Sequence, residues 1–316
     1  MKKIFFIPVL FFQYCFAQDP IFVQSHNNAM YLNPALTGCF ISPVVSVSER
    51  IQWPKLTGTF KTVTASYHQL VRILHGGLGF YFMYDNAGEM TMETSRLNLS
   101  YAAHFEINDQ FKLRVGVTGG YVKRTIDWDK LTFGDLIDPR YGFIYPITTE
   151  RPPSSKAFYD CGIGIVAYTK KIYFGFAADH LNQPDESFIR PAPGSRLPMK
   201  LIVNAGADFQ IGSTDGRISI SPDLIFLQQK SFTQTIASVT GKFYYLLIGT
   251  GLRIDNGFIL SVGLENRWIR LCGSYDQSNS SLANKVGASY ELSVAFKLYT
   301  FLPAKGNWTP IGMKSF

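Results

Sequence analysis

Apolar and polar side chains alternate along most of this chain. From Tyr290 to Leu298 every second residue is apolar, and the residues between them are small or charged. A period of two is the pattern of a β-strand with one apolar and one polar face. The pattern predicts about fourteen strands, at residues 43–51, 57–68, 76–85, 93–106, 110–123, 158–169, 171–180, 197–209, 216–226, 232–240, 243–253, 256–265, 268–277 and 286–299.

The lengths of the predicted connections depend on strand parity. Most connections after even-numbered strands are tight, as at residues 107–109, Lys170, Gly241 and Asn266. Those after odd-numbered strands include every long one, at 124–157, 181–196 and 278–285. An even strand count with short turns at one end and long loops at the other is typical of outer-membrane barrels. The sequence therefore predicts an all-β fold, a transmembrane antiparallel β-barrel of about fourteen strands spanning residues 43–300. A soluble β-sandwich or propeller, the alternative, has no reason to separate its loops in this way.

The first seventeen residues resemble a secretory signal peptide. Met1-Lys2-Lys3 is basic, Ile4 to Phe12 is apolar apart from Pro8, and Ala17 offers a cleavage site. The apolar stretch is shorter than the roughly 20 residues that a spanning helix needs. Export and a mature chain that begins near Gln18 are the expectation, with the bacterial outer membrane as destination.

The composition changes this picture little and excludes several functions. The chain has 26 Phe, 17 Tyr and 27 Gly, and only 17% of its residues are charged. Its net charge is +7, but the basic residues are scattered, so nothing indicates nucleic-acid binding. Beyond the signal peptide the cysteines are Cys39, Cys161 and Cys272, an odd and widely spaced set. A disulfide framework or a zinc site is not expected, although a single bridge stays open.

The sequence lacks the common motifs of hydrolytic active sites. The sequence holds no G-x-S-x-G and no H-E-x-x-H. Gly76-Gly77-Leu78-Gly79 opens a strand and lacks the Lys-Ser/Thr of a phosphate loop, so close packing is its expected role. The 124–157 loop carries aspartates in no calcium-loop spacing, so they are expected to be solvated acids: Asp127, Asp129, Asp135 and Asp138. We expect neither catalysis, nor a cofactor, nor a metal.

The residues after the signal peptide resemble a known family. Gln18-Asp19-Pro20-Ile21-Phe22-Val23-Gln24, Tyr31-Leu32-Asn33-Pro34-Ala35 and Thr37-Gly38 closely resemble the opening of the PorP/SprF family, outer-membrane proteins of the type IX secretion and gliding machinery. The resemblance continues through Arg50-Ile51-Gln52-Trp53-Pro54, Ile126-Asp127-Trp128 and His180-Leu181-Asn182-Gln183-Pro184 to the strand at Tyr290. Residues 301–316 form a tail that departs from the family pattern.

The resemblance implies a non-catalytic adaptor. Such a protein would hold the C-terminal domain of a secreted surface protein, and would contact the periplasmic ring and its peptidoglycan-binding lipoproteins. The candidate partner-binding residues are Asp19, Pro20, Tyr31, Asn33, Pro34, Gly38, Trp53, Asp127, Asp135 and His180. Two other functions stay open. One is a channel for solutes or hydrophobic ligands, and the other is a barrel-borne lipid-modifying enzyme.

Residues 18–42 show no sustained alternation and are not expected to form a strand of the wall. The segment is rich in Asn and Gln, stiffened by Pro20 and Pro34, and too apolar at Phe22 and Leu32 to stay in water. We expect it either to fold into the lumen as a plug or to form a docking site at the periplasmic mouth.

Overall fold

A computed structural model describes residues 19–40, 42–131, 137–138, 140, 142–143, 152–188, 195–212, 218–254, 257–279 and 283–298. The predicted signal peptide, Asp135 and the 301–316 tail lie outside these ranges. No helix in the described part of the chain is both long enough and apolar enough to cross a membrane.

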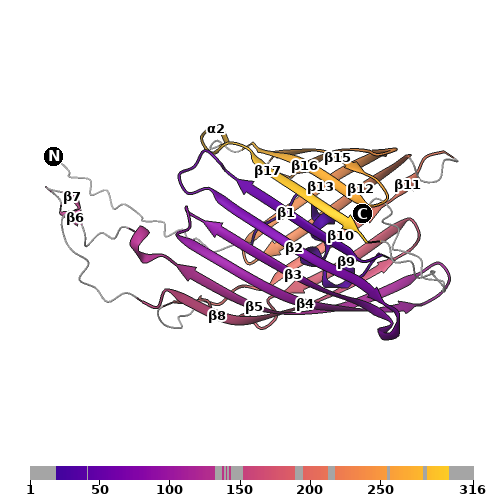
Figure 1. The fold of residues 1–316 in the computed structure, drawn as a ribbon, viewed down its shortest axis with the longest axis horizontal. Coiled ribbons are helices and arrows are strands. Elements are labelled where there is room, and N and C mark those ends of the chain that lie inside the picture. The colour runs from indigo at the N-terminus through magenta and orange to yellow at the C-terminus, as the bar shows by residue number, and fades with distance from the viewer. Residues whose placement is uncertain are drawn as a thin grey trace, which may run out of the picture.

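Long antiparallel strands make up the wall of the molecule (Figure 1). They are β1 (Val44–Gln52), β2 (Phe60–Val71), β3 (Gly76–Ala87), β4 (Met92–Glu106), β5 (Lys112–Ile126), β8 (Ser155–Tyr168), β9 (Ile172–Asp179), β10 (Lys200–Ala207), β12 (Ile218–Gln229), β13 (Phe232–Phe243), β14 (Leu246–Arg253), β15 (Gly257–Glu265), β16 (Ile269–Ser278) and β17 (Ser289–Lys297). Each of the fourteen predicted segments overlaps one of them, with ends that differ by up to three residues.

The sheet closes on itself. Each strand pairs with its neighbours in the chain, β1 pairs with β17 from Val44↔Lys297 to Ile51↔Tyr290, and β10 pairs directly with β12. Because the sheet is closed, every wall strand has a hydrogen-bonded neighbour on both sides, so its backbone N–H and C=O groups are paired as a bilayer requires. The predicted transmembrane barrel of fourteen strands is confirmed. The sequence pattern missed the extra strand β11 (Phe209–Gln210), which pairs with β12, and the hairpin of β6 (Ile137–Asp138) and β7 (Gly142–Phe143) inside the long 124–157 loop.

The long connections lie at one end of the barrel, with one exception. The longest, 127–154 and 180–199, lie at the same end as 279–288, which contains α2 (Ala283–Val286). The other end carries short turns, such as 169–171 and 244–245, together with the longer 208–217 connection that contains β11. We call these the long-loop end and the short-turn end. In outer-membrane barrels the long loops face outside the cell, so the short-turn end is periplasmic.

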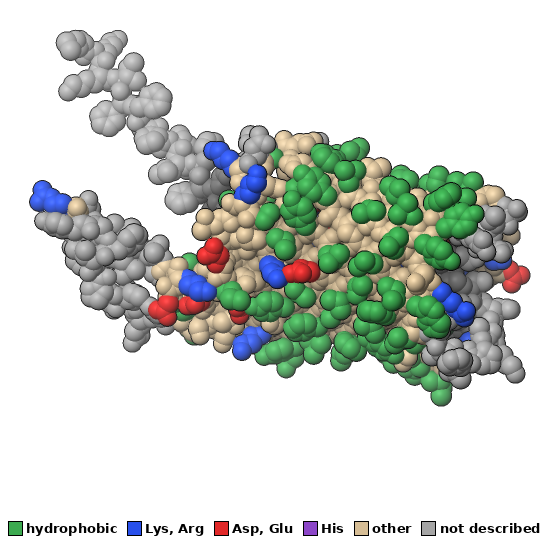
Figure 2. Space-filling model, turned by 45° about the horizontal axis from the view of Figure 1, so that its top comes forward, with side chains coloured by type: hydrophobic (Ala, Val, Ile, Leu, Met, Phe, Trp, Pro, Cys, Tyr) green, Lys and Arg blue, Asp and Glu red, His purple; other side chains and the backbone are tan. Residues whose placement is uncertain are grey.

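Side chains on the outer face of the wall are mostly apolar. Figure 2 shows hydrophobic side chains gathered over the strands, with most charged ones nearer the two ends. On β17, Tyr290, Leu292 and Phe296 are exposed, whereas Glu291 and Ser293 are buried. This exposed apolar surface matches the lipid-facing band of an outer-membrane barrel.

Part of the inner face differs from the small or charged residues that the alternation predicted. Val166, Ile202, Ile225 and Leu227 point inward on β8, β10 and β12, and all four are buried. They contact the segment between Ala29 and Cys39, not water. The tertiary structure thus supplies an apolar partner inside the lumen that alternation along a single strand could not reveal.

The alternation makes a testable prediction about Val294. This residue lies midway between Tyr290 and Leu298 on the outer face of β17, so Val294→Arg places a cation in lipid and should destabilise the barrel by about 2–4 kcal/mol. Val294→Leu keeps the contact with lipid and should have little effect. Urea unfolding in lipid vesicles measures both. Equal stability of the two variants would mean that Val294 does not face the bilayer.

Candidate functional site

Residues 19–40 lie inside the barrel. They form short helices that Figure 1 shows within the ring of strands: η1 (Ser25–Asn28), α1 (Ala29–Leu32) and η2 (Pro34–Leu36). Pro34 begins η2, and the Asn33 side chain caps it by accepting a hydrogen bond from the Ala35 amide at 2.9 Å. This cap and the fixed φ of proline end α1 and start a new turn within one residue. We call residues 19–40 the plug.

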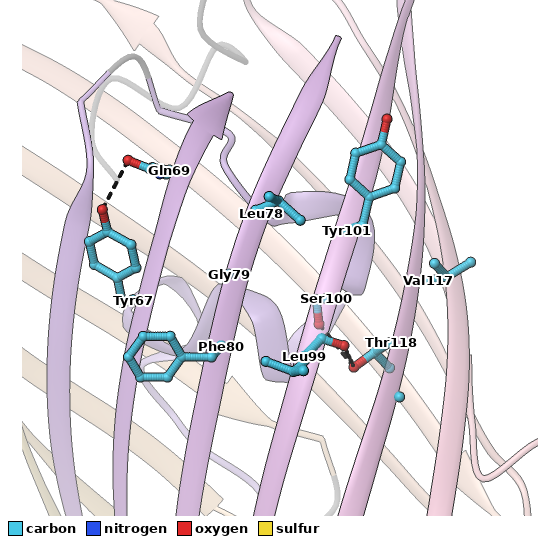
Figure 3. A pocket seen from close by; sticks show the side chains of 11 residues that line it. Tyr67, Gln69, Leu78, Gly79, Phe80, Leu99, Ser100, Tyr101, Val117 and Thr118 are labelled. Atoms are coloured by element: carbon cyan, nitrogen blue, oxygen red, sulfur yellow. Dashed lines mark hydrogen bonds between the residues drawn. The ribbon is translucent and has the colours of Figure 1, made fainter. Parts of the chain in front are cut away.

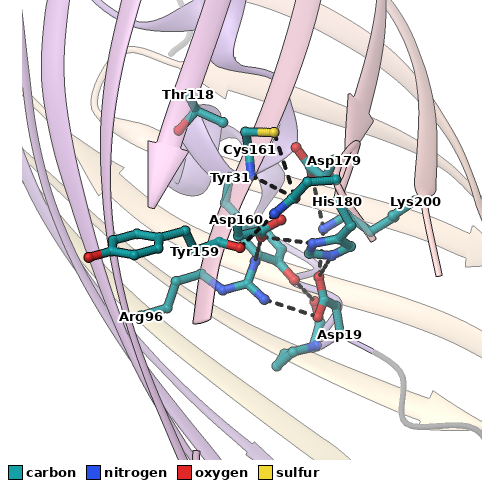
Figure 4. A network of polar contacts seen from close by, with 12 residues as sticks. Asp19, Tyr31, Arg96, Thr118, Tyr159, Asp160, Cys161, Asp179, His180 and Lys200 are labelled. Carbon is teal, nitrogen blue, oxygen red and sulfur yellow. Dashed lines mark hydrogen bonds and ion pairs between the residues drawn. The ribbon is translucent and has the colours of Figure 1, made fainter. Parts of the chain in front are cut away.

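The first contact region of the plug is a buried ion cluster around Asp19 (Figure 4). Asp19 Oδ2 lies 3.0 Å from Lys200 Nζ and 2.9 Å from His180 Nε2, and Asp19 Oδ1 lies 3.4 Å from Arg96. On the wall side, Asp160 Oδ2 accepts from His180 Nδ1 at 2.8 Å, and Asp179 pairs with Lys200 at 3.0 Å. Every one of these side chains is less than 15% exposed. Charges this deeply buried are tolerated only when they are paired.

This arrangement favours the protonated form of His180. Burial alone would lower its pKa, but Asp19 and Asp160 outweigh burial, so the pKa of His180 lies above its ordinary value. Both ring nitrogens face carboxylates, and only the imidazolium can donate to both at once. His180 follows β9 directly and begins the 180–199 connection. The cluster therefore ties the plug to a surface loop.

Tyr31 packs over the same cluster. Lys200 Nζ lies 4.3 Å from the centroid of the Tyr31 ring, and the Tyr31 hydroxyl donates to the Pro20 carbonyl at 2.6 Å. The ring also stacks on Tyr81 of β3, with 5.7 Å between centroids. These contacts fold the first residues of the plug back over α1.

The second contact region lies against β1, β2, β16 and β17. Glu291 accepts from the backbone amides of Val23 and Gln24 at 2.8 and 3.1 Å, and Arg50 lies 3.4 Å from the same carboxylate. Gln24 donates to the Ser274 hydroxyl at 3.1 Å. Side chains on the wall thus satisfy backbone amides that no helix of the plug satisfies.

The third contact region is a glycine-lined surface that receives Asn33 and Pro34. The Asn33 amide donates to the carbonyls of Ile165 and Phe176, each at 3.3 Å. A Cβ on Gly164 would lie 2.0 Å from Asn33 Oδ1, and one on Gly116 would lie 2.3 Å from the Ala35 amide nitrogen. Only glycine lets the chains approach this closely. Arg114 closes the region by donating to the carbonyls of Ala35 and Thr37.

A close backbone contact anchors the far end of the plug. Gly38 has φ +64°, and a Cβ on it would lie 2.5 Å from the Cα of Gly77. The Gly38 amide donates to His68 Nδ1 at 3.1 Å. This contact supplies the close packing that the sequence predicted for the Gly76–Gly79 run.

The structure places seven of the candidate residues in the plug or against it and leaves two apart from it. Six of the seven belong to the plug, and His180 meets them from the wall: Asp19, Pro20, Tyr31, Asn33, Pro34, Gly38 and His180. Trp53 lies in the connection after β1, where its ring packs on Phe60. Asp127 caps the turn η4 (Trp128–Lys130) and stays exposed. Asp135 lies outside the described residues.

Sequence reasoning missed most of the wall residues that hold the plug. Among them are Arg96, Asp160, Lys200, Glu291 and Arg114. Each is a long or charged side chain at an inward position of a strand whose outward neighbours face lipid. That combination is the signal that could have singled them out.

The fold and the plug define a class of protein: an outer-membrane β-barrel whose lumen holds its own N-terminal segment. The family model for the type IX secretion system membrane protein PorP/SprF matches residues 15–296, nearly the whole chain. The chain therefore belongs to the PorP/SprF family, and it resides in the bacterial outer membrane. Comparison with curated protein sequences finds no match.

Several solved structures are similar to this chain. The Ralstonia pickettii toluene transporter TbuX is 9% identical with a TM-score of 0.51, over 86% of this chain and 93% of TbuX. A Pseudomonas aeruginosa FadL homologue is 12% identical with a TM-score of 0.45, over 86% of this chain and 94% of the homologue. Omp33 of Acinetobacter baumannii is 7% identical with a TM-score of 0.45, over 83% of this chain and all of Omp33. At such low identity the likeness concerns the fold alone.

The ion cluster predicts how the plug responds to Asp19→Asn. The substitution removes the charge that meets Lys200, Arg96 and His180, and breaking buried pairs of this kind costs about 3–5 kcal/mol. Amide hydrogen exchange of residues 20–39 should then speed up while the strands stay protected. Asp127→Asn is the matched control, because its pair with Lys130 spans 3.9 Å and is exposed, and such pairs contribute about 0–1 kcal/mol. Unchanged hydrogen exchange of the plug in Asp19→Asn would mean that the ion cluster does not hold the plug in place.

The raised pKa of His180 predicts a loss of plug protection at high pH. The protonated ring contributes its full stabilisation below the ordinary histidine pKa of about 6.5, and loses it as the pH rises through the raised value. Hydrogen exchange of the plug, corrected for the intrinsic effect of pH, should therefore accelerate on the alkaline side. The His180→Gln variant should lack this step, and a step that persists in it would assign the titration to another group.

Proposed function

We propose that this protein is a non-enzymatic adaptor of the type IX secretion system. It binds the C-terminal domain of a secreted or surface protein at the long-loop end and anchors that protein to the outer membrane. At the short-turn end it contacts the periplasmic ring and its peptidoglycan-binding lipoproteins. Membership of the PorP/SprF family supports the secretion role, and the plugged lumen is the observation that carries the choice of an adaptor.

The plug argues against a solute channel. A channel needs a continuous path of water through the lumen, whereas residues 19–40 contact wall strands on opposite sides of it. Asp19 reaches Arg96 on β4 and Lys200 on β10, and Gln24 reaches Ser274 on β16. Opening a path would separate buried charges from their partners, at a cost of several kcal/mol. A permanent plug suits a protein that binds a partner at its surface.

The long-loop end carries an ordered surface for such a partner. Within the 180–199 connection, Glu186 pairs with Arg124 at 2.5 Å and Asp185 pairs with Lys156 at 3.4 Å. The ring of Phe188 packs edge-on against Trp128, which follows β5. Leu197 is buried with Val122 and Phe158. These contacts fix residues 185–188 and 197 before binding, so this part of the surface loses little conformational entropy when a partner arrives, which favours tight association.

The ion cluster connects this surface to the plug. His180 begins the connection that presents Asp185, Glu186 and Phe188, and the same side chain contacts Asp19. A partner that shifts the start of this connection would also act on the plug. We propose that binding of a partner at the long-loop end changes the contact between His180 and Asp19, and so changes how the plug is held inside the barrel.

Co-purification from native outer membranes tests the proposal. The tagged protein should recover a large secreted protein that ends in a type IX C-terminal domain. Arg124→Ala, which releases Glu186 and the 180–199 connection, should reduce that recovery severalfold. Lys61→Ala is the matched control, because it removes an exposed pair with Glu49 between β1 and β2 without touching this surface.

The opposite result would favour a channel. If no secreted protein is recovered, and purified protein makes liposomes swell in small sugars, the adaptor role is wrong. Intact recovery with Arg124→Ala would place the binding surface elsewhere on the barrel.

A further inference from the structure

A hollow interrupts the lipid-facing surface of β2 to β5 (Figure 3). It has a volume of about 560 Å³ and is lined chiefly by apolar side chains, among them Leu78, Phe80, Leu99, Tyr101 and Val117. Its volume lies within the range of about 300–1,000 Å³ that small-molecule sites occupy. We call this hollow the outer groove. It lies on the outside of the wall, separate from the plug.

A missing side chain in one row of the wall creates the outer groove. Cross-strand pairing places Phe80 beside Leu99, and Leu99 beside Gly119. Side chains in such a row normally stand about 4.5–5.5 Å apart and touch. A Cβ added at Gly119 would meet nothing within 4 Å. The row is therefore interrupted between Leu99 and Cys161 of β8, which pairs with Gly119. The gap leaves a depression in the surface that faces acyl chains.

Polar groups line the edge of the outer groove toward the short-turn end. The Tyr67 hydroxyl donates to Gln69 Oε1 at 2.9 Å, and the Tyr101 hydroxyl donates to the Leu74 carbonyl at 2.7 Å. Leu74 belongs to the turn between β2 and β3, η3 (Arg72–Leu74). No described residue accepts a hydrogen bond from the Gln69 amide nitrogen, so this donor can serve a ligand. A polar side chain that faces lipid is costly and points to a specific contact.

We propose that the outer groove binds one phospholipid of the periplasmic leaflet. One acyl chain lies along Leu99 and Gly119 in the space that the glycine leaves. The ester region of the lipid accepts a hydrogen bond from the Gln69 amide near the short-turn end. The surrounding bilayer supplies acyl chains at high concentration, and the polar groups at one edge fix which end of the lipid enters. This site is independent of the adaptor role.

Filling the outer groove tests the proposal. Delipidated full-length protein is titrated with phosphatidylethanolamine in detergent, and bound lipid is counted by native mass spectrometry. The wild-type chain should retain one lipid selectively, and Gly119→Phe should weaken that binding by about tenfold or more, since excluding two methylene groups is sufficient for this. Gly273→Phe is the matched control, because a Cβ at this outward position of β16 also meets open space.

Two further variants keep the test decisive. Leu99→Trp fills the groove while residue 119 stays glycine, and it should weaken lipid binding as Gly119→Phe does. Gln69→Leu leaves the groove open but removes the hydrogen-bond donor, so it should also weaken lipid binding. Heat-modifiable migration on gels verifies that each barrel is folded. Lipid binding that is equal in Gly119→Phe and Gly273→Phe would overturn the proposal. If the wild-type protein proves dimeric in detergent and Gly119→Phe monomeric with unchanged lipid binding, the proposal is also wrong, because the groove is then a contact between copies of this chain.

Discussion

The buried carboxylate of Asp19 depends on charges that come from three separate parts of the wall. Arg96 lies on β4, His180 follows β9, and Lys200 begins β10. No pair of these groups is close in the sequence, so the cluster forms only when β4, β9 and β10 have been brought together in the sheet. Unpaired, each of them would be expensive to bury. The plug therefore depends on the assembled wall.

In the other contacts of the plug, side chains of the wall pair with neutral backbone groups that would otherwise be buried without a partner. A segment whose helices are only three or four residues long leaves most of its backbone amides and carbonyls unsatisfied. Glu291 accepts from two of its amides, and Arg114 donates to two of its carbonyls. The wall thus takes the place that water would have in a loop. Such a plug is specified by its surroundings more than by its own helical propensity.

Residues close together on one strand contact the plug on the inner face of the barrel and form the outer groove on its outer face. Gly116 faces inward and receives the backbone of Ala35, whereas Gly119 faces outward and opens the outer groove. Because side chains alternate along a strand, one wall can carry a site for its own plug and a site for lipid at the same time. In the adaptor role, the 180–199 connection adds a third surface at the long-loop end.

The sequence by itself determined the strands, their outward faces and the family. Alternation is a local property, since a residue's parity along a strand decides whether it meets lipid or lumen. The tertiary structure decided which inward residues meet. Asp19 and Lys200 are far apart in the sequence, and Ile202 and Leu227 face an apolar part of the plug that no single-strand pattern shows. The position of residues 19–40 was open between lumen and periplasm for the same reason: the contacts that hold them belong to strands throughout the chain, and they exist only once the barrel is closed.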